Sequence, residues 1–362
     1  MQNVKVYAKN LEQAAQDQID TLANLEAFSD AKIRIMPDAH AGAGCVIGFT
    51  ADLGEKVVPN LVGVDVGCGL LTVKLTERAD FGRLDEVVRK VVPHGFGVHG
   101  RPTCDVSSLG LRCFDELKKV EHLDRSMGTL GSGNHFLAID EDSEGNHYLV
   151  IHTGSRNLGL QVANIYQRKA VETCEADVPR DLKWLDGHGA EDYLHDMRIC
   201  QEWALQNRES IAKAVMVGMR TDAVAAFQTV HNYIGDDNVI RKGAISAKRG
   251  ERVLIPLNMR DGCLVCTGLG NEDWNESAPH GAGRTMSRTQ ARKTLDLERF
   301  REQMSGVWST TVCRETIDEA PDAYKPSQDI IEAIDGVTVT VEERLREVYN
   351  FKSTQAGGRR RR

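Results

Sequence analysis

The chain has 362 residues, of which 41% are hydrophobic and 27% are charged. This composition predicts a folded globular protein of one large or two smaller domains, and it excludes a charge-rich, disordered chain. The formal net charge is −8, so composition gives no support for broad, non-specific binding to nucleic acid. An acidic protein can still bind nucleic acid through a local basic site.

The cysteines and the hydropathy pattern indicate where the protein works. The nine cysteines are odd in number and spread along the chain, which argues against a disulfide framework and favours a reducing compartment. No run of about 18 apolar residues occurs, and charges interrupt the first segment. We therefore expect a cytoplasmic protein with no membrane partner.

The first half of the chain predicts strands separated by charged helical segments. Residues 1–28 read as a short strand followed by a helix, and short β-branched runs alternate with glycines over residues 33–75. Residues 76–125 look helical and charged around a glycine-rich interruption. A second glycine-dense block over residues 127–159 again predicts strands.

The second half predicts long helices, then strands. Residues 160–235 have helical spacing, whereas residues 252–270 are rich in strand-forming residues. No internal repeat or linker interrupts the pattern. We expect one large domain over residues 1–352, of mixed α/β (α+β) class, with central mixed sheets, glycine-rich strand ends and helical insertions. Residues 353–362 are expected to form a basic, disordered tail.

Residue types that bind transition metals follow the glycine-rich strand ends. Asp65 and Cys68 lie in VDVGCG, His135 in GSGNH and His152 in VIHTGSR. Because residues three apart in an extended strand face opposite sides, Asp65 and Cys68 would share a site only where the glycines of this motif bend the chain. Carboxylate, thiolate and imidazole together suit manganese, zinc or iron. The alternative is an aspartate that caps a turn and an inert core cysteine.

Two further groups have both functional and structural interpretations. His231 lies four residues after Phe227 in a predicted helix and would share its apolar face, either as a ligand or as a buried core histidine. Asn232 would orient a ligand or end the helix. Cys263 and Cys266 resemble half of a zinc site, but no second CxxC pair exists. Their spacing in a strand points them to opposite faces, so we interpret both thiols as structural.

The segment HGAGRTMSR (280–288) is unusual. It predicts a turn that opens a helix and places the imidazole of His280 near backbone N–H groups that can bind phosphate. Arg284 and Arg288 would add positive charge along one helix face, and Arg156 in HTGSRNLG offers a phosphate ligand from a turn. The alternative is an ordinary helix start with a solvated basic face.

Eight motifs occur in an order that covers nearly the whole chain: MPDAH (36–40), VDVGCG (64–69), GSGNHF (131–136), HTGSRNLG (152–159), VHN (230–232), NMRDG (258–262), HGAGR (280–284) and EAPDAYK (319–325). Together they closely resemble the motifs of the RtcB-type RNA-splicing ligases. The combination of the aspartate-cysteine turn, GNHF and HGAGRxxSR makes this resemblance specific.

The resemblance implies a role for each matching residue. Two manganese ions per subunit, or other divalent metals, would be held by Asp65, Cys68, His135, His152 and His231, with the Cys68 thiolate in the bridging position. His280 would be the histidine that GTP guanylylates. The nucleotide would be surrounded by Asp38, Asn134, Asn232, Cys263, Gly281, Ala282, Gly283, Arg284 and Lys352. Arg156 and Arg288 would bind RNA phosphates.

The implied activity is GTP- and manganese-dependent joining of RNA 3′-phosphate or 2′,3′-cyclic phosphate ends to 5′-hydroxyl ends, in RNA repair or tRNA splicing. Its partners would be RNA with broken ends, GTP and an archease-type activator, which some family members use. Two alternatives stay open. One is a metal-dependent phosphodiesterase or RNA end-processing enzyme on the same scaffold, and the other is a non-catalytic protein that binds RNA ends.

The sequence departs from the family pattern where the base would bind. The family typically carries a glutamate two residues after GNHF, where this chain has Ala138, and a serine where this chain has Cys263. A methyl group cannot accept hydrogen bonds from guanine, and a thiol is a weak partner. These two positions predict relaxed base selectivity, so that ATP or another triphosphate would compete with GTP.

Overall fold

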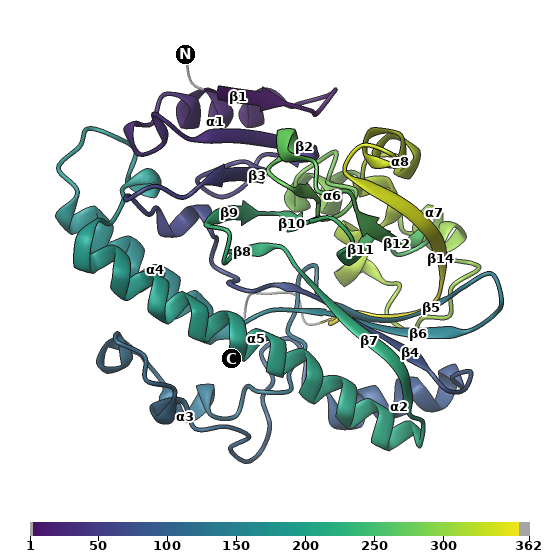
Figure 1. Ribbon diagram of the computed structural model, residues 1–362. Coiled ribbons are helices and arrows are strands. Elements are labelled where there is room, and N and C mark those ends of the chain that lie inside the picture. The colour runs from purple at the N-terminus through teal and green to yellow at the C-terminus, as the bar shows by residue number, and fades with distance from the viewer. Residues whose placement is uncertain (1–2, 355–362) are drawn as a thin grey trace.

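The computed structural model describes residues 3–354 and shows two main sheets flanked by long helices (Figure 1). The α-helices are α1 (Gln13–Ala23), α2 (Phe81–Val91), α3 (Val120–Leu123), α4 (Arg156–Thr173), α5 (Gly187–Met219), α6 (Arg288–Thr294), α7 (Leu297–Gln303) and α8 (Ser327–Ile334). This combination of helices and sheets confirms the expected mixed α/β class.

The smaller main sheet has five strands in the order β1-β2-β3-β9-β8. Its strands are β1 (Asn3–Val6), β2 (Lys32–His40), β3 (Ile47–Asp52), β8 (Asn232–Ile234) and β9 (Val239–Lys242). The first pair is parallel and the others are antiparallel, so this is a mixed sheet. Strand β2 is buried along almost its whole length, because α1 and α8 both pack near it.

The larger sheet is antiparallel, with the order β11-β12-β14-β5-β6-β4-β7. Its strands are β4 (Gly69–Leu75), β5 (Phe136–Glu141), β6 (His147–Thr153), β7 (Ala223–Val230), β11 (Arg252–Asn258), β12 (Gly262–Gly268) and β14 (Val339–Phe351). The edge strands β11 and β7 contact each other, and the amide of Leu254 donates to the hydroxyl of Thr229. The sheet therefore curls into an open barrel. A short pair, β10 (Ala244–Ser246) and β13 (Ser277–Pro279), lies beside it.

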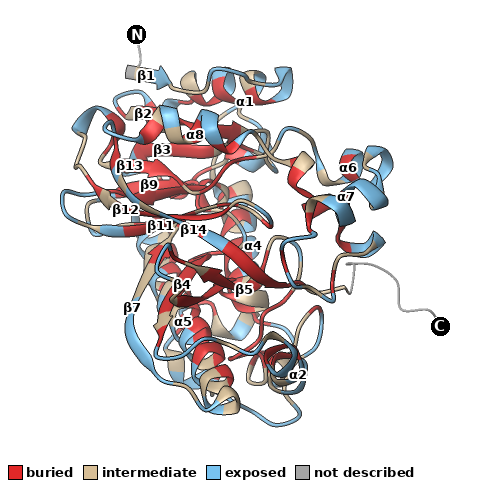
Figure 2. Cartoon of the chain, turned by 90° about the vertical axis from the view of Figure 1, so that its right-hand side faces the viewer, coloured by how far each residue is buried: buried red, intermediate tan, exposed pale blue. Residues whose placement is uncertain are grey.

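Helix α5 packs against the large sheet and against two other helices. It packs on α4 and α2 and crosses β6 and β4, and its buried residues Ile211 and Val215 join Leu84 and Val88 of α2 against the large sheet. Figure 2 shows the resulting buried residues concentrated on the strands and on the inner faces of these helices. The fold is thus anchored by one long helix that supports the strands from which the site is built.

Two segments differ from the sequence-based expectation. The charged region after α2 was expected to be helical, but residues 92–119 are loops with short 3-10 turns. Glycines and prolines interrupt this stretch, so no continuous apolar helix face can form. The segment 277–288 contains β13 and an irregular turn, and α6 begins only at Arg288. His280 therefore does not lie at a helix start, and Arg284 is not on that helix.

The prediction that His231 lies on a helix is also wrong. The run AVAAFQTV forms strand β7, and His231 follows its last residue. Alanines at this position suggested a helix, but β7 pairs along its length with β4, and the tertiary pairing overrides the weak local preference.

The expectations about the cysteines, the membrane and the tail can be compared with the structure. Cys263 and Cys266 pack in different core clusters, which confirms that they face opposite sides of β12, and all nine cysteines are free. Within the described residues, no helix has the length and apolar character needed to cross a membrane. Most of the expected tail, residues 355–362, lies outside the described residues, so its boundary at residue 352 stays a prediction.

Gly69 provides a test of the packing between β4 and β7. A Cβ atom at this position would lie 2.3 Å from the carbonyl oxygen of Thr229 and 2.9 Å from Cα of Val230. Gly69→Ala should therefore lower the free energy of unfolding by about 1–3 kcal/mol, measured by urea denaturation. Gly100→Ala is the matched control, because a Cβ there meets open space, and a similar loss in both variants would contradict the packing argument.

Candidate metal and nucleotide site

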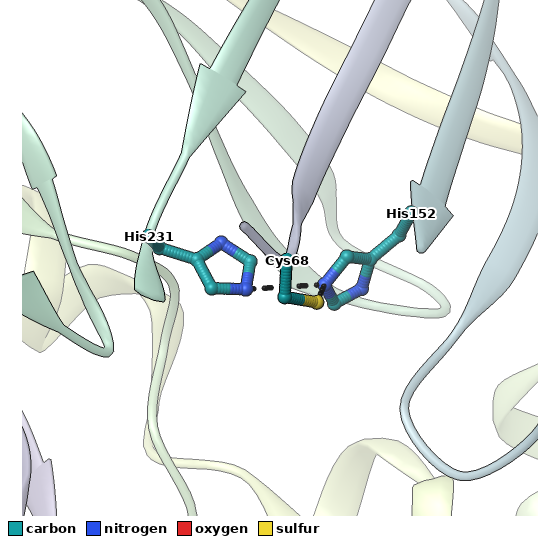
Figure 3. Close-up of side chains that lie close together, drawn as sticks. All are labelled: Cys68, His152 and His231. Atoms are coloured by element: carbon teal, nitrogen blue, oxygen red, sulfur yellow. Dashed lines mark hydrogen bonds between the residues drawn. The ribbon is translucent and has the colours of Figure 1, made fainter. Parts of the chain in front are cut away.

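Three strand ends of the large sheet bring metal-binding side chains together. Cys68 immediately precedes β4, His152 is the penultimate residue of β6, and His231 follows β7. Strand β4 pairs with both β6 and β7, so Gly69 has Thr153 on one side and Val230 on the other. Cys68 is thereby held between two histidines. Figure 3 shows the three side chains pointing toward one another.

The spacing of these donor atoms fits a metal ion. The Sγ atom of Cys68 lies 3.3 Å from Nε2 of His152, which lies 3.3 Å from Nε2 of His231. Ligand atoms around a tetrahedral ion with ordinary bond lengths are separated by about 3.3–3.7 Å. These two separations are therefore typical of ligands that share one ion, and all three donor atoms lie within 4.8 Å of one another.

A second group of donors uses the same cysteine. Asp65, Cys68 and His135 bring their donor atoms within 4.8 Å of one another. Oδ2 of Asp65 lies 2.7 Å from Nε2 of His135, and Sγ of Cys68 lies 3.5 Å from the same nitrogen. Gly67 has a φ of +68°, so the chain bends between Asp65 and Cys68 as the glycine pattern predicts. Because both groups include Cys68, its sulfur is the only donor they share.

The electrostatics of the cluster favour ligand formation. Burial lowers the pKa values of His152 and His231 well below the usual range, so each imidazole is neutral and has a free lone pair. Desolvation alone would raise the pKa of Asp65, but His135 and Arg156 hold it at about 2, so this side chain is a carboxylate. Burial and the Asp65 carboxylate raise the pKa of the Cys68 thiol. Metal binding by Cys68 would therefore release a proton.

His280 lies beside this cluster and is oriented by a buried carboxylate. Its ring centroid is 5.0 Å from that of His231. Nδ1 of His280 lies 2.7 Å from Oδ2 of Asp38, and Asp38, on β2, is fully buried. A carboxylate can only accept, so Nδ1 carries the proton and Nε2 keeps its lone pair. This is the tautomer that a nucleophilic imidazole requires.

A glycine permits the close approach of the two segments. Gly283 has a φ of +72°, and a Cβ atom there would lie 2.1 Å from the carbonyl oxygen of Asp38. The HGAGR turn can therefore rest directly on β2, which brings His280 to the Asp38 carboxylate.

A cavity of about 300 Å³ opens beside His280 and His152. Its wall includes most of the residues that the sequence analysis assigned to the nucleotide and to phosphate: Asn134, Cys263, His280, Gly281, Ala282, Gly283, Arg284, Arg288 and Lys352. Asp38 is not part of this wall, and its hydrogen bond to His280 connects it to the cavity. The structure thus gathers side chains from widely separated motifs around one space.

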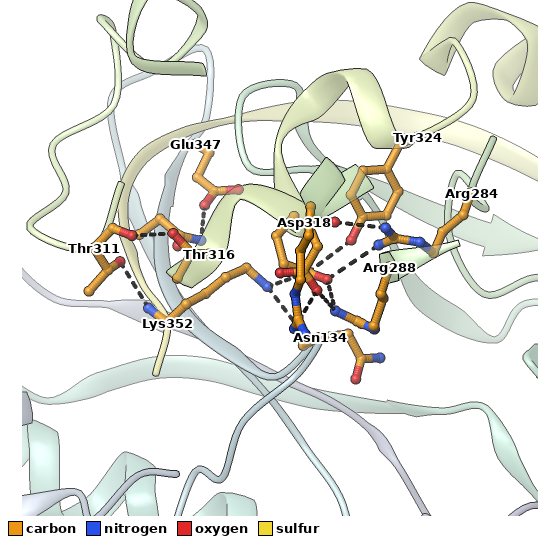
Figure 4. Close-up of polar contacts among 12 residues, drawn as sticks. Asn134, Arg284, Arg288, Thr311, Thr316, Asp318, Tyr324, Glu347 and Lys352 are labelled. Carbon is orange, nitrogen blue, oxygen red and sulfur yellow. Dashed lines mark hydrogen bonds and ion pairs between the residues drawn. The ribbon is translucent and has the colours of Figure 1, made fainter. Parts of the chain in front are cut away.

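Glu319 is the hub of the polar network along this cavity, and Figure 4 labels its partners Arg284, Arg288 and Lys352. Its carboxylate receives Lys352 at 2.7 Å and Arg284 at 3.3 Å, and it also pairs with Arg288. Desolvation alone would raise the pKa of Glu319, but these cations hold it well below the usual range. The hydroxyl of Tyr324 donates to the same carboxylate. The network fixes three cationic side chains that would otherwise repel one another.

Sequence reasoning missed several residues of the site. Glu319 and Tyr324 belong to the motif EAPDAYK, which was recognised but given no role. Asp318 pairs with Arg288 and Arg292. These acids could have been found by asking which carboxylates neutralise the arginines of the preceding motif.

Besides Asp38, two residues expected at the nucleotide or at phosphate lie outside the cavity wall. Asn232 donates to the backbone carbonyl of Asp65 and accepts from the amide of Gly243, so it braces the loop that carries a metal-binding residue. Arg156 lies 3.0 Å from His135, next to the metal-binding cluster. The expected roles of Asn232 at the nucleotide and of Arg156 at RNA phosphate stay predictions.

Comparison with known proteins decides the family. The family model described as tRNA-splicing ligase RtcB matches residues 18–120 and 114–353. The chain belongs to the RtcB family. The RNA-splicing ligase RtcB of Escherichia coli (strain K12) is 30% identical over 405 aligned residues, covering 96% of this chain and 97% of that protein. The tRNA-splicing ligases RtcB of Aeropyrum pernix and Archaeoglobus fulgidus are 29% and 27% identical, covering 80% and 90% of this chain and 81% and 88% of those RtcB proteins.

Removal of the shared sulfur should weaken metal binding. We expect Cys68→Ser to bind Mn²⁺ about tenfold or more weakly than the native protein, because both donor groups lose a ligand. Bound metal is measured by mass spectrometry after equilibrium dialysis. Cys266→Ser is the control, since Cys266 is equally buried but lies in another core cluster. Equal metal content in the native protein and in Cys68→Ser would exclude this cluster as the metal site.

Proposed function

We propose that this RtcB-family protein is an RNA ligase that joins RNA 3′-phosphate or 2′,3′-cyclic phosphate ends to 5′-hydroxyl ends through a histidine-GMP intermediate, with GTP as the nucleotide and two Mn²⁺ ions. The observation that carries the proposal is the position of His280. Its ring lies beside the metal-binding cluster, its Nδ1 atom faces the Asp38 carboxylate, and it borders the cavity.

The metals would be held by the two donor groups that share Cys68, and when bound they would neutralise phosphate charge near the reacting atoms. Asp38 holds the Nδ1 proton of His280 and stabilises the positive charge that develops on the ring. Nε2 then attacks the α-phosphorus of GTP. A phosphorus–nitrogen bond forms while the bond to the bridging oxygen breaks, and pyrophosphate leaves.

Two further displacements complete the proposed reaction. An oxygen of the RNA 3′-phosphate attacks the histidine-bound phosphorus, which frees His280 and leaves GMP on the RNA end. The 5′-hydroxyl of the second strand then attacks the original 3′-phosphate, forms the phosphodiester and displaces GMP. A cyclic phosphate end would first be opened by water to a 3′-phosphate.

The charge around the cavity supports binding of these phosphates. Among the described residues, the four cations Arg284, Arg288, Arg292 and Lys352 form ion pairs with two carboxylates, Glu319 and Asp318. This local surplus of positive charge exists in a chain whose formal net charge is −8. Binding would therefore be confined to this site, because the rest of an acidic protein repels the RNA backbone.

The covalent step can be tested directly. We expect α-labelled GTP and Mn²⁺ to leave acid-labile, base-stable label on the native protein, and His280→Ala to carry none. His188→Ala is the control, since the side chain of His188 is 99% exposed. The native protein should also join 3′-phosphate to 5′-hydroxyl RNA ends. Persistent label on His280→Ala, or a preference for 3′-hydroxyl and 5′-phosphate ends, would overturn the proposal.

Asp38 should act as a positioning residue. In Asp38→Asn the side-chain amide can donate to Nδ1, which favours the tautomer that lacks a lone pair on Nε2. We expect adduct formation to slow by about a hundredfold or more, while the affinity for GTP stays close to that of the native protein. Single-turnover labelling over a range of GTP concentrations separates these quantities. A loss of affinity with an unchanged rate would contradict a positioning role.

A further inference from the structure

One part of the cavity wall has no role in the steps above. It is formed by Glu347 and Asn350 of β14, together with Cys263. In the register of the sheet, Glu347 lies opposite Asp140 of β5, and Asn350 lies opposite Ala138. Side chains at paired positions project to the same face of a sheet. Strand β14 therefore places two polar side chains beside the position where the family's glutamate is replaced by Ala138.

This wall has more hydrogen-bond acceptors than donors. Asp140 is fully buried, and neither of its carboxylate oxygens has a hydrogen-bond partner among the described residues. The thiol of Cys263, a weak donor, faces Asp140. Asn350 is 1% exposed and donates to Glu347, but its Oδ1 atom is also unpartnered. Buried acceptors without donors are costly, so the arrangement favours a ligand that supplies donors.

The nearby cation does not satisfy these acceptors. Nζ of Lys352 is bound by Glu319 and by the carbonyl oxygen of Asn134. Burial raises the pKa of Asp140 to about 7, and burial together with the facing Asp140 raises the pKa of Glu347. The ionised form of each carboxyl group is therefore costly in this buried pair, and donors from a ligand would stabilise that form.

We propose that Glu347 and Asn350, backed by Asp140, read the base of the bound nucleotide and select guanine. This assignment rests on the proposed function, because it requires a nucleotide in the cavity. Guanine presents two adjacent donors, the N1–H group and the N2 amino group, which match a row of acceptors. Adenine presents an acceptor at N1 and only one amino group on that edge. On this assignment the protein keeps its preference for GTP, in contrast to the relaxed selectivity predicted from Ala138 and Cys263 alone.

The test compares nucleotides that differ by single donors. Binding of GTP, ITP and ATP is measured by calorimetry on His280→Ala, which cannot form the covalent adduct. ITP keeps the N1–H group and lacks the N2 amino group. We expect GTP to bind about tenfold or more tightly than ITP, with ATP weaker still, and we expect the GTP to ITP ratio to fall toward one when Glu347→Gln is added.

Two further variants control for folding and for position. Glu342→Gln changes an exposed glutamate of the same strand and should leave the ratio unchanged. Asp140→Asn should lower the GTP to ITP ratio as Glu347→Gln does. Thermal melting detects unfolding of either variant, and Asp140→Asn tests the proposal if Glu347→Gln unfolds. Ratios that stay at the native value in both Glu347→Gln and Asp140→Asn would overturn the proposal, as would equal binding of GTP and ATP by the parent protein.

The outcome also separates this inference from the proposed function. If GTP labels His280 but all nucleotides bind equally, the ligase proposal stands and the base-reading role fails. If no nucleotide binds the parent protein and no label forms on the native protein, both proposals are overturned.

Discussion

The antiparallel pairing of β4 with both β6 and β7 is the constraint on which the site depends. Neighbouring antiparallel strands begin and end at the same edge of a sheet, so residues at the start of one strand meet residues at the end of the next. Cys68 is placed between His152 and His231 in this way, and His135 enters from the adjoining start of β5. A sulfur shared by two donor groups follows from sheet topology and does not require a flexible loop.

His280 and its orienting carboxylate come from a different part of the fold. Asp38 lies on β2 of the five-stranded sheet, whereas His280 follows β13. The side chains that would bind metal come from the large sheet, so the two sets of side chains meet where the sheets face one another. Such a junction leaves an interior space lined by several strands, and it holds each side chain on a rigid element. The same space receives β14, the last strand, whose residues complete the cavity wall.

Positively charged side chains are concentrated at the cavity, although the formal net charge of the chain is −8. An acidic protein can bind a triphosphate or an RNA end only where cations are concentrated and held in place. Glu319 does this by binding Lys352, Arg284 and Arg288 together. Asp140 and Glu347 have the opposite character, since they are buried carboxyl groups that form no ion pair with the described residues. One part of the cavity thus suits phosphates, and another suits the donors of a base.

The sequence by itself determined the mixed α/β class, the strand-rich segments and the family, because glycine-bounded motifs such as VDVGCG and GSGNHF are local and specific. It also identified the side chains that lie close to Cys68. It further indicated that Cys263 and Cys266 of β12 are structural. Only the tertiary structure decided that the segment before His231 is a strand, since its alanine-rich composition suits a helix and pairing with β4 overrides it. The network around Glu319 and the facing pair of Asp140 and Glu347 were likewise invisible in the sequence. Their partners are far apart along the chain, and burial and charge pairing exist only once the strands have come together.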